Sequence, residues 1–529
     1  MSSGYPIVSA PRLIDKNGLK ILLIAEIRGE LSKLNDLAKQ YGSDIIIHTG
    51  NFGFFDENSI DRIHESYLRH IVEFSPLLSS DLITSISKLS KVSGDNVEHL
   101  SNNETNLKKI LENQLISELP YFLKGERKLD YPVYTVSGMC EDSIVLNKFK
   151  YGIYSIPNLF IIDEDHFYKI KTKDGTNILL TGLGGSLSYH KLFHHGTSYE
   201  IPGDPTKIDL IPVSGDPGNI WVTMLQLGKL IDNFTKYYSS ERDSFDESVK
   251  FFITHQSPTR EPLLQHLSIF FKMDFTVSNG LHFKYPSSYN ELSINPNFEN
   301  FKLKFNESRL KLSVIWFKLQ EKFIKLLENI EDLNERNNAI KYISLALDVY
   351  DKIPVSTSNH EEILSIKLTL PEKQQNANKD SLETDESPKK ELTSIIRQLN
   401  DLYYLSFQNT WHFNLCDLSL GSLVLNLNNG EFNMECHAKG FNFNYRKDLS
   451  SDMKKISISS QNQKQGEQDE GASNGKKSFT NDGAESLSTS RTHYNSKNGS
   501  RGGRGRGRGG FVRGSRGRRG GGFTGNNRE

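Results

Sequence analysis

Cysteine is scarce in this chain of 529 residues. The three that occur, Cys140, Cys416 and Cys436, lie far apart, so they form neither a disulfide framework nor a CxxC metal-binding pattern. This usage favours a reducing compartment over a secreted one. The predicted location is the cytoplasm, with the nucleus as an additional one.

Long apolar runs are also missing. No segment approaches the roughly 20 apolar residues that cross a bilayer, and nothing at the N-terminus matches the basic region and apolar run of a signal peptide. We therefore expect no membrane partner. Apolar residues make up only 36% of the chain, which predicts polar segments outside any core, while 10% aromatic residues supply bulk for a sizeable core.

Net charge is small but unevenly placed. The whole chain sums to −1. Residues 501–529 contain nine arginines and a single acid, Glu529, and so carry +8, which leaves −9 on residues 1–500. This asymmetry predicts that the tail binds a polyanion and that any protein partners use the acidic body.

The basic tail has a distinctive composition. Residues 447–529 are rich in Ser, Gln, Asn and Gly and nearly free of aliphatic residues, which predicts disorder. They include an RGG tract at 501–523, in which glycine keeps the backbone mobile while guanidinium groups contact phosphates and stack on bases. The tract predicts RNA as a partner, bound by Arg501, Arg504, Arg506, Arg508, Phe511, Arg513, Arg516, Arg518, Arg519 and Phe523. The alternative is a cationic tail that only solubilises the protein. An arginine methyltransferase is a second expected partner, and methylation would change the hydrogen bonding of these arginines while keeping their charge.

The N-terminal part of the body contains a βαβ pattern. Residues 19–25 and 45–47 are short apolar runs typical of buried strands, and apolar residues between them recur at helical spacing. Because the strands of a βαβ unit are parallel, the residues that follow each strand meet at one edge of the sheet. Those residues are Glu26 and Arg28 after the first strand and Asn51 after the second.

In this arrangement the chain resembles the calcineurin-like metallophosphoesterases. That family has Asp-x-His-Gly after its first strand and Gly-Asp after its second, and these residues supply metal ligands. The corresponding positions here hold Glu26, Arg28 and Asn51. After a third strand the family has Gly-Asn-His-Glu/Asp, where Met139 and Cys140 stand in this chain for the metal-binding Asn and the phosphate-stabilising His.

Two later segments continue the resemblance. Residues 250–258 contain Thr-His followed by Pro, as in the family, so His255 occupies a metal-ligand position unchanged. Further on the family has Gly-His-x-His, of which His282 is kept and the first His is replaced by Gly280. A narrower resemblance is to a fungal branch of the superfamily with the same degenerate frame. It rests on the segments GMCEDSIVLNKF, LLTGLGGS, THQSPTREPLL and VSNGLHFKYPSSYNE and on residues 411–445.

The resemblance implies an α/β fold in which two packed sheets form a metallophosphoesterase-like sandwich flanked by helices. It also implies a two-metal site, which needs a bridging carboxylate. Asn51 cannot supply that charge, and the permanent positive charge of Arg28 repels divalent ions. We therefore expect a pseudoenzyme without catalytic residues, cofactor or bound metal. Its vestigial site comprises Glu26, Arg28, Asn51, Met139, Cys140, His255, Gly280 and His282.

Alternatives remain for this site. Glu26, His255 and His282 could together hold one ion, which would make the protein an active metal-dependent phosphoesterase with an atypical site. Arg28 could instead hold an anion such as a phosphate, or form a buried ion pair with Glu26 or Glu141.

Two further features have simpler interpretations. The histidine cluster His190, His194 and His195 has no acid or Cys beside it and is expected at the surface rather than in a metal site. The glycines within 182–185 match no phosphate-binding motif, so they indicate a tight turn, with a phosphate-cradling loop as the alternative.

The predicted organisation follows from these patterns. Its parts are an N-terminal arm (1–18), a degenerate metallophosphoesterase-like domain (19–300) with an insertion at about 76–125, a helical extension (301–352), a disordered linker (353–391), a helix and β-hairpin that return to the main domain (392–446), and the disordered tail (447–529). The hairpin is predicted because apolar residues alternate around Asn429-Gly430, a pair that favours the type I′ turn. Residues 56–75 are expected to form one helix, and the insertion is expected to be a surface segment.

Overall fold

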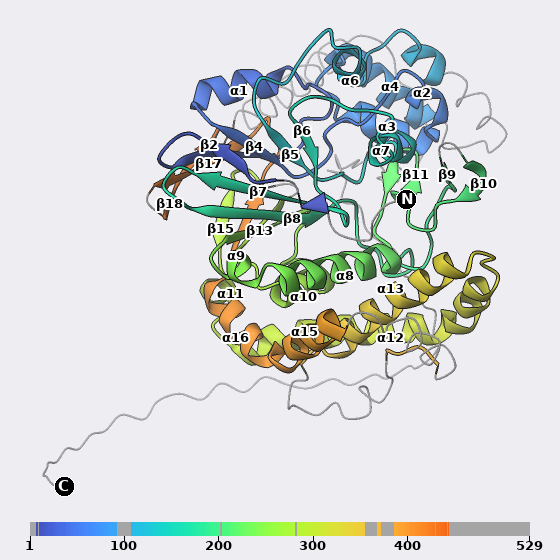
Figure 1. Ribbon diagram of the computed structural model, residues 1–529. Helices are drawn as coiled ribbons and strands as arrows, with labels where there is room; N and C mark the ends of the chain where they lie inside the picture. Colours follow the sequence, from blue (N-terminus) through green and yellow to red (C-terminus); the bar gives the residue numbers. More distant parts are fainter. Residues whose placement is uncertain are drawn as a thin grey trace, which may run out of the picture. The chain divides into compact units, whose positions relative to one another are not determined.

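The structure of the protein, a computed structural model, describes residues 7–8, 10–92, 107–201, 204–280, 283–354, 368–371, 386–428, 430–441 and 443 (Figure 1). They belong to the first of two units into which the chain divides, Met1–Phe443, the second being Asn444–Glu529. The predicted disordered tail with its RGG tract lies outside the described residues, and so does His282.

Short apolar runs of the N-terminal part form a six-stranded sheet. Its parallel strands are β3 (Leu19–Ile24), β4 (Ile45–His48), β5 (Val133–Thr135) and β6 (Leu159–Ile161). The expected hairpin consists of β17 (Gly421–Asn428) and β18 (Glu431–Ala438). Because β17 pairs antiparallel with β3, the strand order is β18-β17-β3-β4-β5-β6.

An eight-stranded sheet forms the second half of the sandwich, in the order β1-β7-β8-β13-β14-β16-β15, with β2 also paired to β7. The strands are β1 (Ile7–Val8), β2 (Arg12–Ile14), β7 (His166–Thr172), β8 (Asn177–Leu183), β13 (Val249–Gln256), β14 (Phe275–Asn279), β15 (Ser287–Tyr289) and β16 (Trp411–Leu415). Parallel pairing joins β8, β13, β14 and β16. The N-terminal arm is part of this sheet, since it contributes β1 and β2.

The two sheets pack face to face through buried apolar side chains. Strand β3 shows the pattern: Ile21 and Leu23 belong to the core between the sheets, whereas Leu22 and Ile24 belong to the core on the outer face. Successive side chains of a strand point to opposite faces. The continuous apolar run of β3 is therefore explained by burial on both sides.

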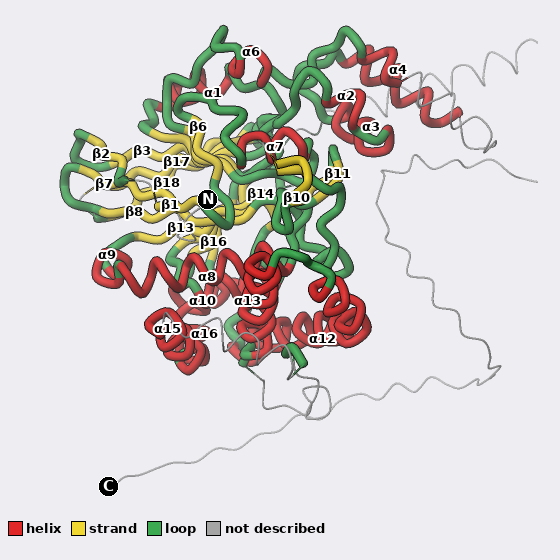
Figure 2. The backbone as a smooth tube through the Cα atoms, turned by 45° about the vertical axis from the view of Figure 1, so that its right-hand side comes forward, coloured by secondary structure: helices red, strands yellow, loops and turns green. Residues whose placement is uncertain are grey.

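Helices cover both outer faces, so that the strands lie between two helical layers (Figure 2). The six-stranded sheet is covered by α1 (Lys33–Tyr41), α6 (Leu119–Leu123) and α7 (Ser143–Lys150). The eight-stranded sheet is covered by α8 (Met224–Ser240) and α10 (Pro262–Phe270). A further layer packs on these two helices and consists of α12 (Phe298–Glu328), α13 (Leu333–Asp351), α15 (Glu386–Arg397) and α16 (Leu399–Asn409). The prediction of an α/β fold with two sheets and flanking helices is confirmed at this level. None of the described helices is both long and apolar enough to cross a membrane.

The remaining described elements are helices of the N-terminal half and of the loops, and two small strand pairs. The helices among them are α2 (Ser59–Arg62), α3 (Glu65–Glu73), α4 (Ser80–Val92), α9 (Arg242–Asp246) and α11 (Glu291–Ile294). Two small antiparallel pairs are formed by β9 (Glu200–Ile201) with β10 (Asp204–Ile208) and by β11 (Gly215–Asp216) with β12 (Asn219–Ile220).

The prediction of one helix over 56–75 is wrong, because the segment forms α2 and α3 with a break between them. Ile63 takes an extended conformation (φ −72°, ψ 133°) and ends α2. His64 then begins α3, since its ring nitrogen accepts the backbone N–H of Ser66 (3.3 Å). Helical spacing of apolar residues alone does not reveal such a cap.

Two segments expected outside the core contribute to it. In the insertion, Leu107, Leu111 and Ile116 are buried in a cluster with side chains of α3 and α4, so the insertion is not only a surface segment. In the expected linker, Leu368 and Leu370 are buried, and α15 already begins at Glu386. Each segment is polar in its average composition but contains a few apolar residues that are buried in a hydrophobic cluster.

Candidate functional site

The candidate site lies at the carboxyl ends of β3, β4, β5, β13 and β14. Five non-glycine residues have a positive φ among the described residues, and three of them are here: Glu26 (61°), Arg28 (47°) and Asn51 (55°). A side chain in this left-handed region costs roughly 1–3 kcal/mol, and such strain collects at functional sites. The loops thus keep a strained shape at the positions that the resemblance assigns to metal ligands.

Backbone hydrogen bonds join the loops after β3 and β4. The N–H of Arg28 donates to the carbonyl of Asn51 (2.8 Å), and the N–H of Gly29 donates to the carbonyl of Phe52 (2.9 Å). A β-carbon on Gly53 would lie 2.4 Å from the Cα of Gly29, and the φ of Gly53 is 101°. Glycine is therefore required at position 53 on both counts.

The Glu26 carboxylate is the centre of the site, and its side chain is only 3% exposed. It accepts hydrogen bonds from Nε of Arg28 (2.8 Å), from Nδ2 of Asn51 to both oxygens (2.9 and 3.0 Å) and from Nδ2 of Asn279. One guanidinium and two amides thus occupy lone pairs that a metal ion would need.

The Arg28 guanidinium is held by three parts of the chain. Besides Glu26 it pairs with Asp417 (Nη1 to Oδ2, 2.6 Å), and its Cζ lies 5.2 Å from the ring centre of Phe74. Of the alternatives left open by the sequence, the ion pair with Glu26 is the one that the structure forms. Two carboxylates beside the guanidinium oppose the binding of an anion there.

Glu141 fastens the loop after β5 to the loop after β4. Its side chain is fully buried and accepts the backbone N–H groups of Phe52 (2.5 Å), Gly53 (3.1 Å) and Gly138 (2.6 Å). Burial raises the pKa of Glu141 to about 7, against the opposing effect of these three hydrogen bonds. Its role is structural, because all of these contacts are made to backbone donors.

Of the next two candidates, Cys140 contacts the site through its backbone, whereas the backbone of Met139 bonds β12. The carbonyl of Met139 accepts the N–H of Ile220 (2.7 Å), and the N–H of Cys140 donates to Oδ1 of Asn51 (2.9 Å). Burial, assisted by the charges of Glu26 and Glu141, raises the pKa of the Cys140 thiol to about 12. The thiol is therefore neutral and cannot act as a nucleophile near neutral pH.

Two histidines lie at the base of the loops. His255 is buried and its Nδ1 donates to the carbonyl of Thr49 (2.9 Å). His48, which the sequence comparison did not single out, is fully buried, with Nδ1 2.9 Å from Oγ1 of Thr135. Burial and the nearby His255 lower the pKa of His48 to about 3, so it is neutral. Both imidazoles bond groups of this chain and connect β4 with its neighbours.

Gly280 stands where the resemblance places a metal-binding histidine, and the space is closed. A β-carbon on it would lie 2.7 Å from the ring of Phe283 and 2.8 Å from the carbonyl oxygen of Leu415. Its N–H also donates to that carbonyl (2.5 Å). A side chain at this position would displace the Phe283 ring and the end of β16.

The residues present do not fit a two-metal centre. Such a centre needs a bridging carboxylate and several further neutral or anionic ligands. Here Arg28, Asn51 and Asn279 are hydrogen-bond donors to the single carboxylate of Glu26. Within the part of the chain that the structure describes, no three His, Cys, Asp or Glu side chains are grouped so that they could hold an ion.

The histidine cluster and the glycines near the end of β8 have local structural explanations. His194 and His195 stack with ring centres 6.1 Å apart, and Nδ1 of His194 accepts the N–H of Gly196 (3.0 Å). Near the end of β8, β-carbons on Gly182 and Gly184 would lie 2.1 and 2.0 Å from neighbouring oxygens. Close packing therefore explains these glycines without a phosphate.

The structure brings together Glu26, Arg28 and Asn51, as the strand-end argument predicted, and with them Cys140 and His255, which the resemblance had indicated. It also adds residues that the sequence did not indicate as part of the site, namely Asn279, Asp417 and His48, and it gives Glu141 a role in holding the loops instead of an ion pair with Arg28. Asn279 and Asp417 both follow or end strands of the eight-stranded sheet. A rule that collects polar residues at all strand ends would have found them.

Comparison with known proteins concerns the C-terminal third of the body. No curated protein matches the chain. The matching segment, residues 285–446, contains β15 and β16 of one sheet and β17 and β18 of the other, so it completes both sheets and supplies Asp417 to the site. The family that this segment matches is described as "Protein of unknown function (DUF2433)".

Proposed function

We propose that this protein is a non-catalytic, metallophosphoesterase-like pseudoenzyme that binds RNA through its RGG tract and acts in mRNA or ribonucleoprotein metabolism in the cytoplasm. The proposal that the protein is a pseudoenzyme rests on the environment of the Glu26 carboxylate. Its carboxylate is buried and engaged by Arg28, Asn51 and Asn279, which leaves the strand-end loops cross-linked by the chain itself.

This cross-link does the structural work that bridging metal ions perform in a two-metal enzyme. A guanidinium supplies the positive charge that the buried carboxylate needs, and the amides complete its hydrogen bonds. A metal ion would have to displace Arg28 from both Glu26 and Asp417. The strained loops are thus retained for the architecture of the edge, while the chemistry is absent.

The test of the pseudoenzyme proposal uses the full-length protein, incubated with excess Mn²⁺ or Zn²⁺ and then desalted. Elemental analysis should find far less than one metal per chain, and hydrolysis of a chromogenic phosphodiester should not exceed that of a His255→Ala variant. About two metals per chain, as a two-metal mechanism requires, together with hydrolysis that His255→Ala abolishes, would establish the alternative of an active phosphoesterase instead.

The second half of the proposal rests on the nine arginines of residues 501–529. Binding to a fluorescent unstructured RNA should weaken with salt by a slope of about 0.7 in log affinity per phosphate contacted. Full-length variants separate charge from stacking: replacing all nine arginines with lysine should reduce affinity, and replacing them with glutamine should abolish it. Equal affinity of the glutamine variant and the wild type would assign RNA binding to the acidic body and refute the role of the tract.

A further inference from the structure

A cavity of about 340 Å³ lies on the other side of the β5 loop from the Glu26 site. It opens beyond the carboxyl ends of β5, β6 and β8, where ligands of α/β sheets bind, and its volume is within the range of small-molecule sites. Ser137 lines the cavity, while the next residue, Gly138, contacts Asn51. The two sites are therefore adjacent but separate.

The walls of this cavity are aromatic and aliphatic. Phe149 of α7, Tyr154 of the following loop and Tyr168 of β7 contribute rings, and Leu159 and Ile161 contribute the side chains of the edge strand β6. All five are only half-buried, so they present apolar surface to the cavity. Aromatic faces carry negative electrostatic potential and attract cations.

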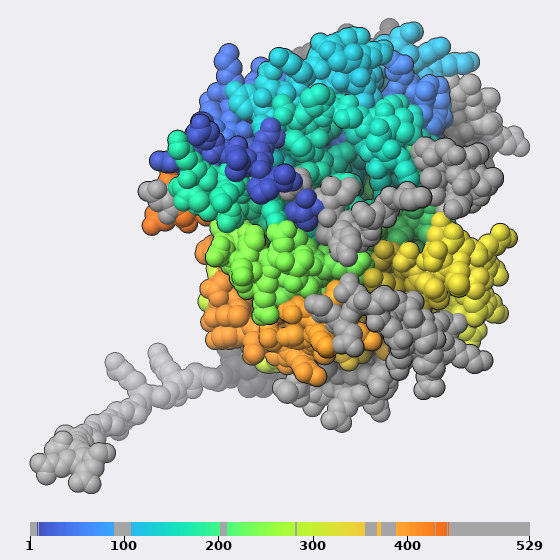
Figure 3. Space-filling model, in the orientation of Figure 1, coloured from blue at the N-terminus to red at the C-terminus, as the bar shows by residue number. Residues whose placement is uncertain are grey.

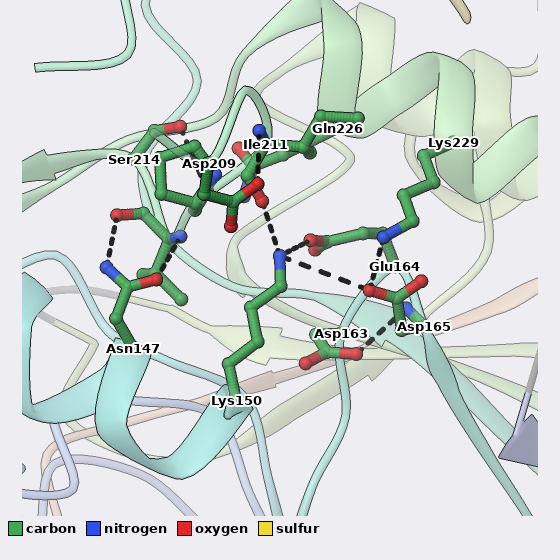
Figure 4. Close-up of polar contacts among 12 residues, drawn as sticks. Asn147, Lys150, Asp163, Glu164, Asp165, Asp209, Ile211, Ser214, Gln226 and Lys229 are labelled. Carbon is green, nitrogen blue, oxygen red and sulfur yellow. Dashed lines mark hydrogen bonds and ion pairs between the residues drawn. The ribbon is translucent and has the colours of Figure 1, made fainter. Parts of the chain in front are cut away.

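The floor of the cavity is charged, and the ammonium group of Lys150, which lines it, is fully engaged (Figure 4). Nζ of Lys150 contacts Oε1 of Glu164 (2.6 Å), the carbonyl of Ile211 (2.5 Å) and Asp165 (4.0 Å). Burial alone would lower the pKa of Lys150, but Glu164 and the other carboxylates raise it above its usual value. Lys229 pairs with the same Asp165 (2.6 Å).

The two carboxylate oxygens of Asp163 differ in their contacts. Its Oδ1 accepts the N–H of Asp165 (2.8 Å) and contacts Nδ1 of His166 (2.7 Å). Among the described residues no hydrogen bond ends on its Oδ2, and Figure 4 shows that oxygen without a contact to the other residues drawn. Both Asp163 and His166 line the cavity. The charge of Asp163 raises the pKa of His166 to about 9, against the effect of burial, so His166 counts as a cation.

The charged side chains that line the cavity are Lys150, Asp163, Glu164 and His166. Glu164 is paired with Lys150, and Asp163 is paired with His166 through its Oδ1. Charges that are removed from water are normally paired. Oδ2 of Asp163 is therefore the anionic position open to a ligand cation, whereas the two carboxylates would repel an anion.

We propose that this cavity binds a small organic cation, an ammonium group on an aromatic or aliphatic body, with the ammonium at Oδ2 of Asp163 and the body against Phe149, Tyr154 and Tyr168. The site is independent of the RNA-binding tract and of the vestigial phosphoesterase site, and its ligand requires no metal.

The test is calorimetric titration of the full-length protein with three small molecules that share one body. Tyramine carries the ammonium, tyrosol a hydroxyl in its place, and 4-hydroxyphenylacetate a carboxylate. Tyramine should saturate one site per chain, tyrosol should bind at least about tenfold more weakly, as loss of a charge-assisted hydrogen bond implies, and 4-hydroxyphenylacetate should not bind. No saturation by tyramine at about 10 mM, or equal binding of tyrosol, would overturn the proposal.

Two variants locate the site. Asp163→Asn keeps the acceptor for the N–H of Asp165 but removes the charge, and should weaken tyramine binding at least about tenfold. Asp15→Asn removes an equivalent charge from a side chain that is 94% exposed, and should leave binding unchanged. Phe149→Leu removes a ring and should weaken binding about threefold to tenfold without any change of charge. Unchanged affinity in both Asp163→Asn and Phe149→Leu would place the cation elsewhere and refute the assignment.

Discussion

Replacing Arg28 with alanine removes the one cation that contacts the Glu26 carboxylate among the described residues. Stranding one member of a buried ion pair costs about 3–5 kcal/mol. The Arg28 side chain is 26% exposed, and Asn51 and Asn279 continue to donate to Glu26. We therefore expect a loss of about 2–3 kcal/mol in the free energy of unfolding, measured by denaturant titration with tryptophan fluorescence.

A control and a double-mutant cycle isolate the pair. Lys33→Ala removes a lysine from its half-exposed pair with Glu30 and should cost only about 0.3–0.5 kcal/mol. Glu26→Gln should make the loss of Arg28 less harmful, with a coupling energy of at least about 1 kcal/mol. If Arg28→Ala cost no more than Lys33→Ala, the ion pairs of Arg28 with Glu26 and Asp417 would not stabilise the loops at this edge of the sheet. That result would contradict the role assigned to Arg28.

The remaining predictions concern the same loops. Gly53→Ala should lower the melting temperature far more than Gly125→Ala, because both residues have a positive φ but only position 53 lacks room for a β-carbon. Glu141 holds its proton to higher pH when folded, its pKa being about 7 instead of 4.5. Its contribution to stability should therefore fall as pH rises from about 4.5 to 7, by at most about 1.4 kcal/mol per pH unit. Subtracting the stability profile of Glu141→Gln from that of the wild type should show this slope, and parallel profiles would refute it. In the native protein at pH 7.5 a maleimide should label the exposed Cys436 well before Cys140, because the pKa of the Cys140 thiol is about 12. Peptide mass spectrometry measures the two labelling rates, and equal rates would contradict the burial of Cys140.

Sequence patterns were informative wherever the physical signal is local. The apolar runs of β3 and β4 predict strands buried on both faces, and the left-handed turns at Glu26 and Asn51 occur where those strands end. The pairing of Arg28 with Asp417 could not be predicted, since nothing near either residue indicates the other. The donors to Glu26 come from the loops after β3 and β4 and from the end of β14, and only the sheet order makes them neighbours. Sequence alone therefore predicted the edge of the sheet, and the fold determined which groups meet there.

The C-terminal segment of the body lies at two places in the fold. In Figure 3 its orange residues appear beside the blue N-terminal residues and again beside the green helix layer. Strand β3 ends at Ile24, and its partner β17 begins at Gly421. A ribosome that adds about 5–20 residues per second needs roughly 20–80 s to make the chain between them. During that time one edge of β3, the apolar run LKILLI, has no strand beside it. Such an edge is a template for aggregation, so the newly made chain should need chaperone protection until its last strands emerge.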